Sequence, residues 1–128
     1  MKHSDIIKNI KARNEKLFRA SFITLMSQTI IKSPVDTGRF RANWIAAIGG
    51  MDTTTTTDTD KGGSSTIGRI SATINGMDLG VTGYLTNSLP YSLRLEYGHS
   101  AQAPSGIVRP LEKQWPRIVY QTAKGLRK

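Results

Sequence analysis

The sequence predicts an α+β fold in one domain, residues 1–128, with helices at both ends and an antiparallel sheet in the middle. Two observations predict it. Apolar residues recur at three- and four-residue steps in both terminal segments, whereas the middle contains alternating apolar segments separated by turn residues. Strands grouped between helices favour an antiparallel sheet with the helices packed on one face. The chain is long enough to bury a single core.

A long amphipathic helix is predicted over residues 4–32. Its apolar residues recur at helical steps, and most of its lysines and arginines lie between them. The apolar face widens around Phe22 to Met26, so we expect the second half of the helix to be the more buried. Pro34 disfavours helical geometry at Ser33 and ends the helix.

The segment SPVDTGRFRAN predicts a reversal of the chain followed by one helical turn. Asp36 is interpreted as an N-cap that accepts hydrogen bonds from backbone amides, and Gly38 as a site of close backbone approach. Residues 39–43 then form the single turn. It leads into a strand over 43–48, where the alternation around Trp44 is typical of a sheet.

A Thr-rich segment, MDTTTTTDTDKGGSST, follows at 51–66 and contains one apolar residue. Burial cannot offset its ordering entropy, so it is predicted to be a flexible loop between two strands. Alternation over 69–74 predicts the next strand, which ends at the turn dipeptide Asn75-Gly76. The segment LGVTGYLTN, at 79–87, adds one or two short strands. We therefore expect three to five strands in the sheet.

Two further helices are predicted in the last third of the chain. A short helix begins near Pro90 and ends at Gly98. A C-terminal helix over 109–128 begins near Pro110, and Pro116 lies in its first turns or kinks it. The inner face of this last helix is predicted to contain Leu111, Trp115, Ile118, Val119 and Thr122.

The positive charge of the chain is concentrated at its two ends. The net charge is +9, with seven Lys/Arg against two acidic residues in 1–32, and six against one in 109–128. The segment between them has five against six. This distribution favours contact with a polyanion or an acidic partner surface. The alternative, which the distribution fits equally well, is that the positive charge only keeps an oligomer soluble.

The composition excludes several classes of site. Without cysteine there is no disulfide framework and no Cys-ligated zinc, and His3 and His99 are too few for a histidine site. We therefore expect no metal and no cofactor. Lysines interrupt the first 13 residues, and no stretch approaches the length of a membrane span, so we expect neither export nor membrane contact.

The tripeptide Asp36-Thr37-Gly38 raises one catalytic alternative, a dimeric aspartic protease. Such an enzyme holds two carboxylates at the ends of buried apolar strands, where they share one proton. Here a lysine, a serine and a proline precede the tripeptide, and Arg39 and Arg41 follow it, which favours full ionisation. Because no other catalytic motif occurs in the sequence, we predict no catalytic residues and no enzymatic activity.

Two stretches together resemble the small neck and tail-completion proteins of tailed bacteriophages. SPVDTGRFRANW is similar to the family's Pro-Val-Asp-Thr-Gly-Arg signature. NSLPYSLRLEYGHSAQAPSGIVRP is similar to its Asn-x-x-x-Tyr-Ala-x-x-x-Glu-x-Gly signature, with Ser92 where alanine is usual. The matching positions are Pro34, Asp36, Thr37, Gly38 and Arg39 in the first motif, and Asn87, Tyr91, Glu96 and Gly98 in the second.

The resemblance implies a structural, non-enzymatic virion protein of the bacteriophage neck. Such a protein is a homo-oligomeric ring around the DNA channel, with six-fold symmetry preferred and twelve-fold symmetry as the alternative. Its implied partners are a portal, adaptor or head-closure protein on one side and a tail tube or terminator protein on the other. Assembly in the host cytoplasm and non-specific contact with the DNA in the channel are further expectations.

Eight residues are candidates for structural or interface roles. Glu96, near a helix end, is predicted to pair with Arg39 or Arg41 within or between subunits; the alternative is a solvated carboxylate that contributes little. The loop 51–66 has three aspartates against one lysine, which favours a protein partner over DNA. The eight candidates are Asp36, Gly38, Arg39, Arg41, Asn87, Tyr91, Glu96 and Gly98.

Two other binding functions stay open at this point. A tail terminator, which caps the tail tube, differs from a neck ring only in the layer that it occupies. A free nucleic-acid-binding protein would use the same basic helices. The sequence lacks the interleaved aromatic and basic residues of such proteins, and Trp44 and Trp115 lie on predicted core faces.

Overall fold

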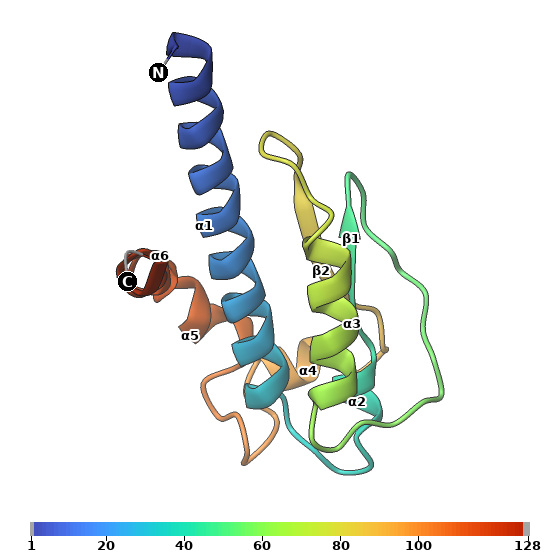
Figure 1. Ribbon diagram of the computed structural model, residues 1–128. Coiled ribbons are helices and arrows are strands. Elements are labelled where there is room, and N and C mark those ends of the chain that lie inside the picture. Colours follow the sequence, from blue (N-terminus) through green and yellow to red (C-terminus); the bar gives the residue numbers. More distant parts are fainter. Residues whose placement is uncertain (1, 127–128) are drawn as a thin grey trace.

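The computed structural model describes residues 2–126 as one mixed helical and sheet fold, which confirms the predicted α+β class (Figure 1). Helices come first and last along the chain, and the strands lie between them. The elements are α1 His3–Lys32, α2 Arg39–Ala42, β1 Trp44–Ile48, α3 Ser64–Ile74, β2 Gly83–Asn87, α4 Ser92–Glu96, α5 Val108–Glu112 and α6 Trp115–Leu126.

The helix α1 is the centre of the fold and confirms the helix predicted over 4–32. In Figure 1, α5 and α6 lie on one side of it and α3 on the other, and all three contact it. Ser33 has an extended backbone and ends the helix before Pro34. Every residue of 2–14 is exposed, whereas the buried residues of α1 all lie in its second half, as predicted.

Three isoleucines are exposed on the N-terminal turns of α1, which extend beyond the other elements in Figure 1. The exposed fractions are 42% for Ile6, 65% for Ile7 and 53% for Ile10. Ile10 follows the other two at steps of three and four residues, so all three lie on one face of the helix. We call these three residues the isoleucine ridge.

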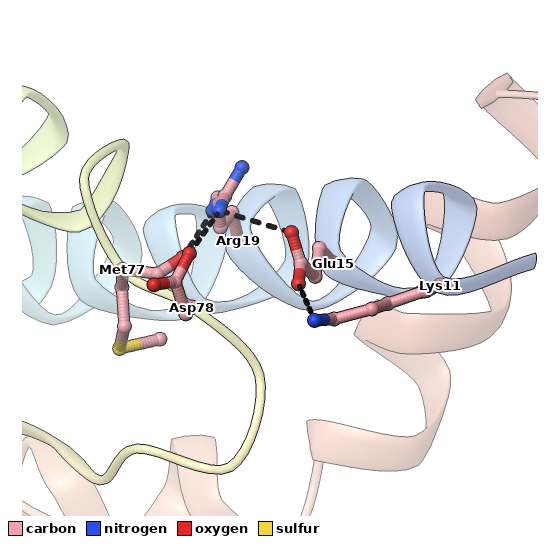
Figure 2. A network of polar contacts seen from close by, with 5 residues as sticks. All are labelled: Lys11, Glu15, Arg19, Met77 and Asp78. Carbon is pink, nitrogen blue, oxygen red and sulfur yellow. Dashed lines mark hydrogen bonds and ion pairs between the residues drawn. The ribbon is translucent and has the colours of Figure 1, made fainter. Parts of the chain in front are cut away.

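A network around Arg19 lies where the exposed part of α1 ends and its packed part begins. The Arg19 guanidinium donates to the carbonyl of Met77, and it lies 3.5 Å from the carboxylate of Asp78 and 3.3 Å from that of Glu15 (Figure 2). Glu15 is also 3.9 Å from the Nζ of Lys11. Arg19 therefore attaches α1 to the segment that follows α3.

The sheet has two strands in the part of the chain that the structure describes. They pair antiparallel from Trp44 opposite Asn87 to Ile48 opposite Gly83. The strand predicted at 43–48 is confirmed as β1. The predicted count of three to five strands is wrong, because residues 69–74 are helical and the segment 79–87 supplies one strand that begins only at Gly83.

Residues 69–74 belong to the helix α3 rather than to a strand. Thr66, Ile70 and Ile74 are buried at four-residue steps and form one face of this helix. A step of four residues fits strand alternation equally well, so the spacing of Ile70 and Ile74 could not distinguish a helix from a strand. The carboxylate of Asp60 favours the helix, because it accepts from the amides of Gly63 at 3.0 Å and Thr66 at 2.8 Å.

Hydrogen bonds attach the Thr-rich loop to the short helix α2 and its C-cap. The side chain of Asn43 is buried and holds the backbone of Thr56, accepting from its amide at 2.8 Å and donating to its carbonyl at 3.0 Å. Near the loop's end, the amide of Asp60 donates to the carbonyl of Gly38 at 3.0 Å. The segment predicted as a loop to residue 66 ends at Gly63, and its flexibility stays a prediction.

The predicted C-terminal helix is two helices, α5 and α6, with Lys113 and Gln114 between them. Pro116 is the second residue of α6, where its missing amide has no intrahelical partner to lose. The ring of Trp115 packs edge-on against Phe18 of α1, with ring centroids 6.4 Å apart. This contact places the start of α6 against the middle of α1.

An apolar groove runs between α1, β2 and the start of the two C-terminal helices. Two adjoining hollows of about 310 and 330 Å³ form it, and they share Phe22, Leu25 and Trp115. Among the described residues that line it, Glu112 is the one with a charged side chain. The full lining consists of Phe18, Phe22, Leu25, Met26, Thr29, Trp44, Val81, Thr82, Gly83, Leu85, Val108, Leu111, Glu112 and Trp115.

Candidate functional site

The first sequence motif lies where α1 ends and α2 begins. Ser33 is buried there; its hydroxyl donates to the carbonyl of Thr29 at 2.7 Å and accepts from the indole of Trp44 at 2.8 Å. The next residue, Pro34, is also buried and has no amide that needs a partner. The polar groups at this reversal are therefore satisfied by the core around them.

Gly38 suits its position by its conformation and by its lack of a side chain. Its φ of 91° lies in the left-handed region that favours glycine. A Cβ on Gly38 would lie 2.6 Å from the amide nitrogen of Lys61 and 2.8 Å from the carbonyl carbon of Asp60. Gly38 therefore lets the end of the Thr-rich loop touch the start of α2.

Arg41 binds backbone carbonyls from two segments of the chain. It donates to Ile31 at 2.7 Å and to Ser33 at 3.1 Å, both at the end of α1, where carbonyls lack helical partners. It also donates to the carbonyl of Lys61 at 2.7 Å. Arg41 therefore joins the end of α1 to the end of the loop.

Asp36 does not act as the predicted N-cap of α2. Gly38 occupies the N-cap position, and the hydroxyl of Thr37 accepts from the amide of Arg39 at 3.2 Å. Asp36 is exposed, and within residues 2–126 no hydrogen bond or ion pair reaches its carboxylate. Arg39 is also exposed, and its guanidinium donates to the carbonyl of Thr56 at 3.3 Å.

The second motif packs directly on the first, although the two are far apart in the sequence. The side-chain amide of Asn87 donates to the carbonyl of Phe40 at 2.8 Å, and the ring centroids of Phe40 and Tyr91 lie 6.0 Å apart. Gln102 accepts from the amide of Val35 at 2.9 Å and donates to its carbonyl at 3.0 Å. We call the region where 33–41 meets 87–102 the motif corner.

Glu96 holds the start of α5. Its carboxylate accepts from three successive backbone amides, those of Ile107 at 2.9 Å, Val108 at 2.8 Å and Arg109 at 2.9 Å. The guanidinium of Arg109 lies 3.4 Å from the same carboxylate and donates to the carbonyl of Glu96 at 2.6 Å. Within the chain, the predicted pairing with Arg39 or Arg41 is therefore wrong, because these three amides and Arg109 occupy the carboxylate.

Three carboxylates among the described residues have a lowered pKa: Asp52, through hydrogen bonds from Thr54, and the two that hold the start of a helix, Glu96 and Asp60. Partial burial raises the pKa of Glu96, but the amides of Val108, Arg109 and Ile107 and the charge of Arg109 lower it by more. For Asp60, burial also raises the pKa, while hydrogen bonds from Thr66 and Gly63 and the charge of Arg41 lower it by more. Glu96 and Asp60 are therefore ionised acceptors at neutral pH.

Gly98 follows α4 and has a φ of 86°. A Cβ on this residue would overlap the carbonyl of Pro104, so the chain folds back closely here. The neighbouring Tyr97 is 65% exposed, and the guanidinium of Arg109 lies 5.0 Å from its ring centroid. The second motif therefore presents an aromatic ring and a cation at the surface.

An open pocket of about 280 Å³ lies on the motif corner. Asp36, Arg39, Tyr91 and His99 line it, but among the described residues no hydrogen bond joins any two of these side chains. The described part of the chain also holds no group of three or more His, Asp or Glu placed to bind a metal. The corner offers exposed charge and an aromatic ring, which are features of a contact surface.

Sequence reasoning missed three of the residues that build this region. Asn43 gave a weak signal, because it is a polar residue between the apolar Ala42 and Trp44 and proves to be buried. Gln102 gave none, because its partner Val35 is 67 residues away. The pairing of Arg109 with Glu96 likewise depends on how the segment between them folds back.

Comparisons of the chain with models of known families, with curated proteins and with solved structures found no match. Among residues 2–126, no helix has both the length and the apolar character needed to cross a bilayer. Function is therefore inferred from the residues and contacts described above.

Proposed function

We propose that this protein is a structural, non-enzymatic component of a bacteriophage virion that forms a ring at the head–tail junction. The ring encircles the DNA channel and connects the portal-side connector to the tail. The proposal starts from the resemblance of two sequence motifs to neck and tail-completion proteins. Both motifs belong to one corner of the fold, as expected if they form one module.

The observation that carries the proposal is the convergence of the two motifs. Asn87 and Gln102 bond to backbone atoms of the first motif, and Tyr91 packs on Phe40. The motif residues therefore have structural roles in the fold, which require no catalytic activity. These contacts hold the backbone of the corner, and several of its side chains are exposed, among them Asp36, Arg39 and Tyr91.

The placement of charge supports a basic surface that faces a partner. The basic segment 1–32 contains α1 and the basic segment 109–128 contains α6, and these two helices pack against each other. Their combined positive charge would attract the phosphates of DNA in the channel or an acidic protein surface. The proposed protein partners are a portal, adaptor or head-closure protein and a tail tube or terminator protein. Six-fold symmetry is preferred, with twelve-fold symmetry as the alternative.

Electron cryo-microscopy of purified virions tests the proposal. We expect ring-shaped density for this chain between the portal and the tail. Absence of the protein from the neck would contradict the proposal. Copurification with tails that lack heads would instead identify a tail terminator. Tight, steeply salt-dependent binding of a monomer to random duplex DNA would identify a free nucleic-acid-binding protein.

A further inference from the structure

The isoleucine ridge on α1 has no covering segment among the described residues. Residues 2–14 are all exposed, and the ridge places three large apolar side chains on one face of a projecting helix. A helical segment of this length is marginally stable by itself in water. Clustered apolar side chains at an exposed position are typical of an interaction surface.

The apolar groove is the matching concave surface on the same molecule. Helices that bind in grooves do so through apolar residues at steps of three and four, which is the spacing of Ile6, Ile7 and Ile10. The groove is lined by apolar side chains of α1, β2 and α6, such as Phe22, Leu85 and Trp115. Its two exposed members on α5 are Val108 and Glu112.

The segment 109–128 is basic overall, but the charge in the lining of the groove is complementary to the charges beside the ridge. Lys11 and Arg13 lie beside the ridge on α1, and the charged residue in the lining of the groove is the acidic Glu112. If two ridges instead packed on each other, their lysines and arginines would face like charges, which opposes association. The charges therefore favour contact between a ridge and a groove.

The ridge cannot reach the groove of its own chain. The stretch of α1 from Ile10 to Phe22 is continuous helix and about 18 Å long. Contact between the two surfaces therefore requires two copies. Because the surfaces differ, the contact is head-to-tail, and repeating it produces a closed ring or an open filament.

We propose that the isoleucine ridge of one copy docks in the apolar groove of the next copy. This inference rests on the proposed ring and names the interface that would build it. Each copy then contributes one ridge and one groove, and the motif corner stays outside the contact. The N-terminal turns of α1, exposed in the single chain, become buried by assembly.

Complementary variants test the docking. The ridge variant is Ile7→Ser with Ile10→Ser, and the groove variant is Val108→Arg. Ala72→Arg, at an exposed alanine on α3 that lies outside both surfaces and outside the motif corner, is the control. We expect the wild type and the control to form the same closed oligomer in sedimentation velocity. Each variant should weaken association by about a hundredfold and sediment as a monomer with unchanged circular dichroism.

Mixing the two variants gives the decisive result. The ridge variant keeps its groove and the groove variant keeps its ridge, so an equimolar mixture should form a one-to-one dimer that cannot grow. A mixture that stays monomeric would overturn the docking. A single variant that still forms the wild-type oligomer would also overturn it, while leaving the proposed ring intact. A wild type that stays monomeric would contradict both proposals.

Disulfide trapping provides an independent readout, because the chain has no cysteine of its own. A chain carrying both Ile10→Cys and Val108→Cys should form covalent multimers on oxidation, since docking brings the two positions into bonding range between copies. Ile10→Cys combined with Ala72→Cys is the control and should stay uncross-linked. Failure of the first pair to cross-link would overturn the proposed contact.

Discussion

The motif corner and the N-terminal turns of α1 are held in opposite ways. At the corner, Arg41, Asn87 and Gln102 each bond to the backbone of a distant segment. In residues 2–14 of α1 every residue is exposed, and the isoleucine ridge has no covering segment in the described structure. The chain supplies the contacts of the corner by itself, whereas the described residues supply none that cover the ridge.

Under the proposed docking, this difference separates residues that hold the fold from residues that make contacts between copies. Substitutions at the motif corner should change the free energy of unfolding of the single chain. Substitutions on the ridge should leave that free energy nearly unchanged, because exposed positions contribute little to it. Parallel measurements of unfolding and association therefore test whether the two regions have separate roles.

The largest loss of stability is expected for Gly38→Ala. The substitution combines left-handed strain with overlap against the backbone of residues 60–61, which we expect to cost about 4 kcal/mol of unfolding free energy. Gly49→Ala is the matched control, with a φ of 83° but nothing within 4 Å of the new Cβ, and should cost about 1 kcal/mol. Urea unfolding measures both; equal losses would show that the close approach contributes nothing.

Asn43→Ala should have the next largest effect, about 3 kcal/mol, because it removes a fully buried side chain that makes three hydrogen bonds, two with the backbone of Thr56 and one with the carbonyl of Arg39. It also tests the predicted flexibility of the loop. In the wild type the Thr56 amide is held by Asn43, so its hydrogen exchange should be slower than that of Thr55. Exchange of Thr56 that is fast in the wild type and unchanged in the variant would contradict this attachment.

The elements that were predicted correctly are those whose signals are local. The apolar repeat and Pro34 define α1, and the alternation around Trp44 defines β1. The helix α3 was missed because Ile70 and Ile74, four residues apart, fit either period. The deciding group was Asp60, which lies in a loop whose composition predicted disorder and which supplies the acceptor for the first amides of α3.

The sequence predicted which residues are important at the motif corner, but not the contacts that they make. The motifs singled out Gly38, Arg41, Asn87 and Glu96, all of which make specific contacts in the fold. Their partners are mainly backbone atoms, which carry no sequence signal. An acidic residue in one motif and arginines in the other therefore predicted an ion pair, whereas the folded chain placed three backbone amides and the guanidinium of Arg109 against Glu96.

Glu96→Gln should lower the free energy of unfolding by about 2 kcal/mol at neutral pH. The NH₂ group of glutamine cannot accept hydrogen bonds from the backbone amides that donate to the carboxylate of Glu96. The folded pKa of Glu96 lies below its ordinary value of 4.5. Its stabilisation is therefore complete well above pH 4.5 and is lost as the pH falls through the lower, folded pKa. Unfolding measured from pH 7 to 3 should show a smaller decline in the variant; identical slopes would contradict this role.

Asp36→Asn should have the smallest effect, within about 0.5 kcal/mol, because Asp36 is exposed and makes no hydrogen bond or ion pair among the described residues. The N-cap role that the sequence predicts for Asp36 would instead imply a loss of about 1 kcal/mol. The same substitution at Asp60, whose carboxylate holds the start of α3, should produce that larger loss. If both variants unfold alike, the assignment of capping to Asp60 fails. If Asp36→Asn leaves unfolding unchanged but weakens assembly, the charge of the tripeptide serves a contact between molecules, and the motif corner then shares the role assigned to the ridge.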